Sequence, residues 1–123
     1  MEVLMPIDWI ISENTVVQPD VSVIDQPVKE NYLTFPPVII FEILSPSTQK
    51  KDQGLKFELY QGEGVKYYII VDPMNRSAKS YRLENKEYCL ISDSGDAVIE
   101  LESGSVRVPF DMGEIWGSFA RLI

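Results

Sequence analysis

The sequence predicts an α/β fold, α+β in its layout, with a central mixed β-sheet, one crossover helix and a C-terminal hairpin extension. The first observation is a strand pattern at 38–44, a helix pattern that ends near Gln61 and a second strand pattern at 65–72. This order predicts a right-handed crossover between two parallel strands. The second observation is that β-rich stretches separated by short turns lie before and after this unit, which predicts antiparallel hairpins.

The N-terminal β-rich stretches are 2–11 and 15–24. The residues between them, 12–14, have side chains that favour a tight reversal, so we expect a hairpin here. The polar segment 25–34 predicts a connecting loop, and the two prolines at 36–37 stiffen the entry to the next strand.

Segment 38–44 is nearly continuous in apolar residues, which predicts a central strand covered on both faces. The hydroxyl residues at 45–48 supply N-cap candidates for a helix that ends near Gln61 and is closed by Gly62 and Gly64. On this helix, we expect Leu55 and Leu59, which are four residues apart, to form a stripe that packs on the core. Phe57 or Tyr60 is expected at the margin of this stripe.

The C-terminal third predicts a second hairpin, from 78–83 and 86–92, across the turn Glu84-Asn85. Short strands are expected at 97–101 and 106–108. Segment 110–119 predicts a short amphipathic helix whose apolar residues are Ile115, Trp116 and Phe119.

The length of 123 residues fits one domain, because independent cores usually need on the order of 100 residues each. We therefore predict a single domain over 1–123. The longest apolar run is far shorter than the roughly 20 residues of a membrane-spanning helix, and the start of the chain does not resemble a secretory leader. These observations predict a cytoplasmic protein with no membrane partner.

The sequence contains no histidine and one cysteine, Cys89. This composition excludes histidine-dependent triads, imidazole-bound zinc and an internal disulfide. We expect Cys89 to be buried and inert, because free cysteine mostly behaves as a small hydrophobe. The chemistry left open uses carboxylates, lysine, tyrosine and a hard metal ion.

One constellation of residues fits that chemistry. Asp20 follows Pro19 in one predicted strand, Glu42 interrupts the apolar central strand, and Lys56 lies on the helix that follows. Carboxylates on adjacent strands, which lie about 4.8 Å apart, can share one Mg²⁺ ion, or Mn²⁺ in its place. The backbone carbonyl of Ile43 is a candidate third ligand. An ion held in this way would support phosphodiester hydrolysis, with Lys56 assisting the attack.

Two of these three residues also have a purely structural explanation. Asp20 could cap a strand end through backbone hydrogen bonds. Lys56 could be the exposed partner of Asp52 on the same helix face. Glu42 is the hardest to explain structurally, because an acid flanked by apolar residues is rarely buried without a partner.

The motifs VVQPDVSVI, PPVIIFEILSPST and DQGLKFELYQGEGVKYYIIVDP occur in this order. With them the chain resembles the Uma-two family of restriction-endonuclease-like proteins, within the PD-(D/E)XK nuclease superfamily. The resemblance implies a restriction-endonuclease-like core in which Asp20 and Glu42 bind Mg²⁺. Position 44, where the superfamily motif has a lysine, is a leucine, and Lys56 is the family-consistent replacement.

The resemblance also predicts that the domain lacks the family's usual N-terminal segment. We expect a sheet without that covering to associate with a second copy, giving a homo-oligomer, most simply a dimer.

Two functions follow from the sequence. The first is a Mg²⁺-dependent endonuclease, a hydrolase whose partner is nucleic acid, with DNA preferred. The second is a catalytically silent nuclease-fold interaction domain, which the net charge of −8 favours because nucleic-acid binding relies on positive charge.

Overall fold

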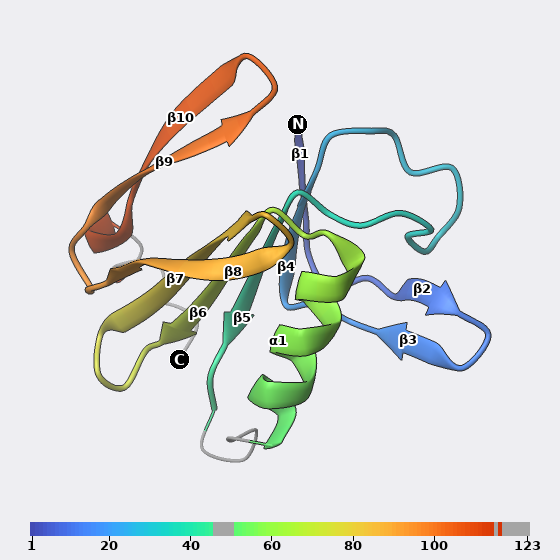
Figure 1. Ribbon diagram of the computed structural model, residues 1–123, viewed down its shortest axis with the longest axis horizontal. Coiled ribbons are helices and arrows are strands. Elements are labelled where there is room, and N and C mark those ends of the chain that lie inside the picture. Colours follow the sequence, from blue (N-terminus) through green and yellow to red (C-terminus); the bar gives the residue numbers. More distant parts are fainter. Residues whose placement is uncertain (46–50, 115, 117–123) are drawn as a thin grey trace.

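The computed structural model describes residues 1–45, 51–114 and 116, and the helix side chains from Gln53 onward. Its centre is a mixed six-stranded sheet in the order β1-β4-β5-β6-β7-β8. The predicted fold class, a mixed sheet with one crossover helix and hairpins on either side, is confirmed (Figure 1). The strands of this sheet are β1 (Glu2–Leu4), β4 (Val21–Ile24), β5 (Ile39–Ile43), β6 (Tyr67–Asp72), β7 (Ser77–Glu84) and β8 (Glu87–Asp93).

The N-terminal hairpin is present but divided into two parts. Its inner part pairs β1 with β4, and its outer part pairs β2 (Trp9–Ser12) with β3 (Thr15–Val17) in a separate ribbon. Both parts share one antiparallel register. Glu2 pairs with Ile24, and Trp9, seven residues later, pairs with Val17, which lies seven residues before Ile24. Pro6 and Pro19 lie in the interruption, where a residue without an N–H cannot extend a ladder.

The crossover connects β5 to β6 through helix α1 (Lys51–Glu63), and the two strands are parallel, as predicted. The helix ends in a Schellman arrangement: the N–H of Val65 donates to the carbonyl of Tyr60, and Gly64 adopts a φ of 85°. Gly64 therefore closes the helix. Gly62, predicted to share this role, lies inside α1.

The face of α1 that packs on the sheet differs from the predicted stripe. Leu55 is 73% exposed, whereas Tyr60 is fully buried and Phe57 and Leu59 pack against the same core. Gln53, Lys56, Phe57 and Tyr60 follow the i, i+3, i+4, i+7 spacing of one helix face. Half of the inward face is thus polar, which is why leucine spacing alone placed Leu55 wrongly, although Leu59 packs as predicted.

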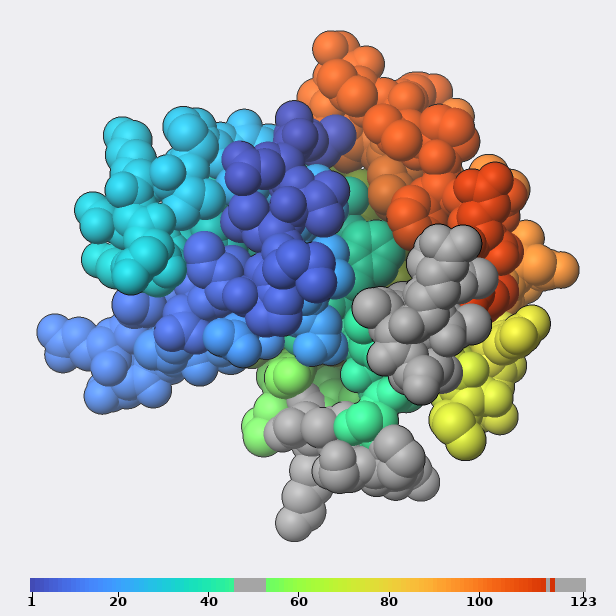
Figure 2. Space-filling model, turned by 180° about the vertical axis from the view of Figure 1, so that it is seen from behind, coloured from blue at the N-terminus to red at the C-terminus, as the bar shows by residue number. Residues whose placement is uncertain are grey.

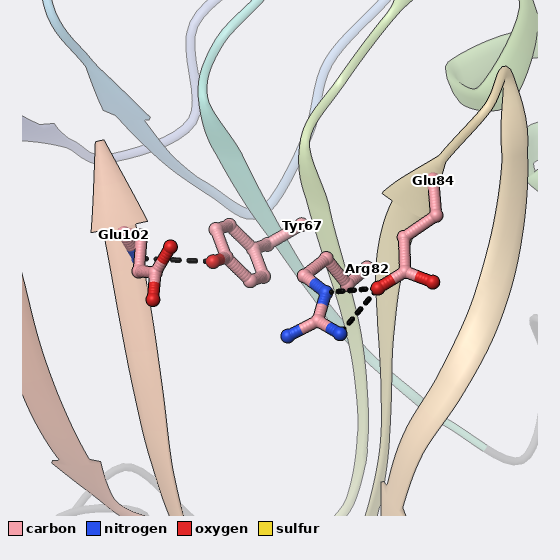
Figure 3. A network of polar contacts seen from close by, with 4 residues as sticks. All are labelled: Tyr67, Arg82, Glu84 and Glu102. Atoms are coloured by element: carbon pink, nitrogen blue, oxygen red, sulfur yellow. Dashed lines mark hydrogen bonds and ion pairs between the residues drawn. The ribbon is translucent and has the colours of Figure 1, made fainter. Parts of the chain in front are cut away.

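The opposite face of the sheet is covered by a ribbon of β9 (Val98–Ser103) and β10 (Val106–Asp111), which lies apart from α1 in Figure 1. Ile99 and Leu101 bury their side chains in the core on this face. Tyr67 crosses from β6 to the ribbon, where its hydroxyl oxygen accepts a hydrogen bond of 2.9 Å from the Glu102 N–H (Figure 3). Beside it, Arg82 pairs with Glu84.

Two further expectations are wrong. The helix expected over 110–119 does not begin at Phe110, because β10 continues to Asp111 before a 3-10 turn at Met112–Glu114; Trp116 is helical as expected, and 115 and 117–119 lie outside the described residues. Cys89 is exposed, because it lies on β8, an edge strand with few covering groups. Among the described residues, no helix has the length and apolar character needed to cross a membrane.

Candidate functional site

The site begins with the pairing of β4 and β5. Val21 pairs with Phe41, so one further step along this antiparallel register brings Asp20 opposite Glu42. The Asp20 Oδ2 accepts a hydrogen bond of 2.7 Å from the Ile43 N–H. The two carboxylates predicted from the sequence therefore lie side by side, with Glu42 on β5 and Asp20 immediately before β4.

Glu42 faces α1, because side chains alternate along β5 and Ile40, two residues earlier, belongs to the core beneath the helix. The residue is 7% exposed. Its Oε1 accepts a hydrogen bond of 2.8 Å from the Tyr60 hydroxyl, and its Oε2 lies 3.5 Å from the Lys56 Nζ. Lys56 thus pairs with Glu42; the Asp52 side chain, its predicted partner in the alternative explanation, lies outside the described ones.

These groups open into a cavity of about 360 Å³. A larger cavity of about 630 Å³ lies on the opposite face, between β1 and β10, and its lining is mostly apolar. Figure 2 looks onto that second face, with dark-blue β1 and the orange ribbon on either side of the teal β5. We place the candidate site in the smaller cavity, because reactive groups converge there; its lining is Asp20, Glu42, Ile43, Leu44, Ser45, Gln53, Lys56 and Tyr68.

Burial raises the pKa of the Glu42 carboxyl to about 7, and the neighbouring Asp20 acts in the same direction. The Tyr60 hydrogen bond and the Lys56 charge lower this pKa but do not cancel the effect of burial. A carboxylate in this position carries its charge at a cost, and a bound cation would reduce that cost.

The donor set fits a hard divalent cation, since both candidate ligands are carboxylates and Mg²⁺ and Mn²⁺ prefer oxygen. The Ile43 carbonyl, predicted as a third ligand, belongs to a residue whose N–H points toward Asp20. In a regular strand the N–H and C=O of one residue point to the same edge, so this carbonyl lies on the Asp20 side of β5. In the described part of the chain, no group of three or more acidic or thiol side chains forms a metal cluster.

A family model described as "Putative restriction endonuclease", Uma2, matches residues 3–108 of this chain. The chain belongs to the Uma2 family. The resemblance drawn from the sequence motifs is confirmed by this match. A comparison with curated proteins finds no match.

The Uma2 assignment agrees with the fold. The chain is similar to the crystal structure of "a putative nuclease belonging to DUF820" from Anabaena variabilis, with a TM-score of 0.73 and 17% sequence identity. The similarity covers 94% of this chain and 67% of the other. By family and fold, the chain is a nuclease-like domain of the Uma2 family.

The structure brings together Asp20, Glu42 and Lys56, and it adds two tyrosines to this Uma2 site. Tyr60 contacts Glu42 directly, and Tyr68 lines the cavity. From the sequence, Tyr60 was expected at the margin of the helix stripe and not in the site. The signal that pointed to Tyr60 was its position four residues after Lys56, which places both side chains on one helix face.

Proposed function

We propose that this domain is a Mg²⁺-dependent endonuclease that hydrolyses phosphodiester bonds in nucleic acid, with DNA as the preferred substrate. The observation that carries the proposal is the neighbouring pair Asp20 and Glu42, with Lys56 3.5 Å from Glu42, in one cavity of a Uma2 domain. The description of the family, "Putative restriction endonuclease", supports DNA over RNA.

In this proposal Asp20 and Glu42 hold the divalent cation, and the Ile43 carbonyl is available as a further ligand. When bound, Mg²⁺ or Mn²⁺ supplies a Lewis acid for the phosphodiester and lowers the pKa of a water nucleophile. The Ile43 N–H fixes the orientation of Asp20 through its 2.7 Å hydrogen bond. Lys56, whose side chain is 31% exposed, lines the cavity, and its ammonium can neutralise charge that develops on the phosphate.

The test combines a metal titration with a cleavage assay. We expect calorimetry with Mn²⁺ to give a saturable signal for the wild type and none for Glu42→Ala or Asp20→Ala. Lys56→Ala should keep the metal signal and lose cleavage of single-stranded and duplex DNA and RNA at low salt, because lysine is not a ligand. Equal cleavage by the wild type and Lys56→Ala would contradict the role given to Lys56.

The alternative is a nuclease-fold interaction domain without catalysis. The net charge of −8 favours it, since phosphate binding relies on positive charge. The same experiment separates the two functions: saturable metal binding without cleavage of any substrate, in Mg²⁺ or Mn²⁺, would support the silent domain.

We also propose that the protein works in the cytoplasm as a homo-oligomer, most simply a dimer. β1 is one of the two edge strands of the sheet, and its Val3 is 66% exposed beside the similarly exposed Met1 and Met5. An unpaired edge with apolar side chains favours association with another copy. Light scattering that shows only a monomer at high concentration would contradict this.

A further inference from the structure

Tyr60 is the most buried side chain on the inward face of α1, one turn after Lys56. A buried phenol normally needs a hydrogen-bond partner, and the partner here is the Oε1 of Glu42, at 2.8 Å. In this contact the phenol hydroxyl is the donor and the carboxylate oxygen is the acceptor.

The Tyr60 ring is held from two sides. Trp9 stacks on it with a centroid distance of 6.1 Å and an interplanar angle of 20°, and Tyr68 meets it edge-on at 5.1 Å. Trp9 belongs to β2, which pairs with β3, and β3 leads through 18–19 into Asp20. The N-terminal hairpin thus supports the Glu42 side of the site through Trp9 and Tyr60, and carries Asp20 directly.

The two oxygens of the Glu42 carboxylate consequently have different neighbours. Oε1 is held by a buried neutral donor, whereas Oε2 is 3.5 Å from an ammonium group that lines the cavity. This distance is longer than a direct charge-assisted hydrogen bond, and the Lys56 side chain is 31% exposed. The buried phenol has no comparable freedom, because neighbouring rings fix its position.

We propose that Tyr60 is a positioning residue whose hydroxyl fixes the Glu42 carboxylate, so that the second carboxylate oxygen is presented to a divalent cation in the cavity. This inference rests on the proposed function. It assigns to Tyr60 the role that an outer partner plays at metal sites, where it orients a ligand without touching the ion.

The first experiment measures Mn²⁺ affinity by calorimetry for the wild type and Tyr60→Phe. The substitution keeps the ring and its packing and removes only the donor. We expect the dissociation constant for Mn²⁺ to rise about 10- to 100-fold, as is typical when an outer partner of a metal ligand is lost.

Tyr67→Phe is the matched control. Tyr67 is equally buried, comes from the opposite face of the sheet and also uses its hydroxyl in one hydrogen bond, to the Glu102 N–H (Figure 3). Thermal unfolding should show a small loss of stability for each variant, but the Mn²⁺ affinity of Tyr67→Phe should equal that of the wild type. An unchanged affinity in Tyr60→Phe, or an equal loss in both variants, overturns the proposal.

A second measurement separates this inference from the proposed function. Crystal structures of metal-free wild type and Tyr60→Phe should show the Glu42 carboxylate in different positions; an unmoved carboxylate overturns the positioning role.

If the wild type binds no Mn²⁺, the proposed function fails, and the crystal structures alone decide whether Tyr60 holds Glu42. A wild-type structure with Mn²⁺ should keep the contact between Tyr60 and Glu42, and a broken contact overturns the proposal even if Tyr60→Phe does not fold.

Discussion

On the face of the sheet under α1, strands β5 and β6 contribute Glu42 and Tyr68; on the face under the β9–β10 ribbon, the same strands contribute Phe41 and Tyr67. The two tyrosines are adjacent in sequence and equally buried. Tyr67 connects the ribbon to the sheet through a backbone hydrogen bond, whereas Tyr68 lies beside the carboxylates and lines their cavity.

The two faces of the sheet differ in whether they bury a charged group. The α1 face buries a carboxylate whose pKa is raised to about 7, and its partners are a phenol, a lysine and a second carboxylate. The ribbon face has an apolar core and a mostly apolar cavity. Because side chains alternate along each strand, one sheet can bury a polar site on one face and an apolar core on the other. The free-energy cost of burying charge arises on the α1 face.

The largest effect that we expect is on the ribbon side, from Gly95→Ala in the turn between β8 and β9. A Cβ at Gly95 would lie 1.8 Å from the backbone oxygen of Arg76, so two backbone segments would have to separate. Trp116 also donates a hydrogen bond to the Gly95 carbonyl and would lose its geometry. We expect the free energy of unfolding to fall by about 3 kcal/mol or more in chemical denaturation.

Gly62→Ala is the control for this prediction. It lies in α1, and a Cβ there meets nothing within 4 Å. Because alanine favours helix over glycine, the free energy of unfolding should rise by about 0.5 kcal/mol. Similar changes in the free energy of unfolding for Gly95→Ala and Gly62→Ala would show that the turn at Gly95 accommodates a Cβ. The two faces would then not differ in how tightly they are packed at these positions.

The second prediction concerns Glu42→Gln and pH in metal-free buffer. The folded-state pKa of Glu42, about 7, exceeds the ordinary value of 4.5, so between these values the folded protein binds more protons than the unfolded one. Stability must therefore fall as the pH rises from 4.5 to 7. Asp20, Lys56, Tyr60 and Tyr68 face this carboxyl from the elements packed around it.

The neutral amide that Glu42→Gln introduces does not titrate, so the substitution removes this dependence. At pH 8 we expect Glu42→Gln to unfold with a free energy higher than that of the wild type by up to roughly 3 kcal/mol, and at pH 4 the two should be nearly equal. Glu102→Gln, which alters an exposed ion pair on the ribbon, should change stability by less than about 1 kcal/mol. A difference that is the same at pH 4 and pH 8 would contradict the burial cost assigned to Glu42.

Much of the fold followed from local patterns. The apolar run around β5 and the helix after it predicted the parallel crossover, and a carboxylate inside that run marked Glu42 as unusual. Asp20 was found through the Pro-Asp step and the family motif. The register that places Asp20 opposite Glu42 depends on long-range pairing, which the sequence expresses only through the alternation of the two strands.

The inward face of α1 could not be predicted from apolar spacing. The helix turns Gln53 and Lys56 toward the site and Phe57 and Tyr60 toward the core, so its buried face mixes polar and aromatic residues. A leucine pair four residues apart fits the same period, but only Leu59 of the pair packs on the core, while Leu55 is exposed. Functional sites are where such local rules are expected to fail, because the polar residues there serve binding and chemistry more than packing.

The smallest effect that we expect comes from the residue at the centre of that error. Leu55 is 73% exposed, so Leu55→Lys should change the free energy of unfolding by less than about 0.5 kcal/mol. Leu59→Lys on the same helix is the comparison, because Leu59 packs against the core under α1 and should lose about 1 to 2 kcal/mol. Urea denaturation of both variants measures the difference. Equal losses would mean that α1 is rotated about its axis relative to the sheet, and that Tyr60 and Lys56 do not face Glu42 together.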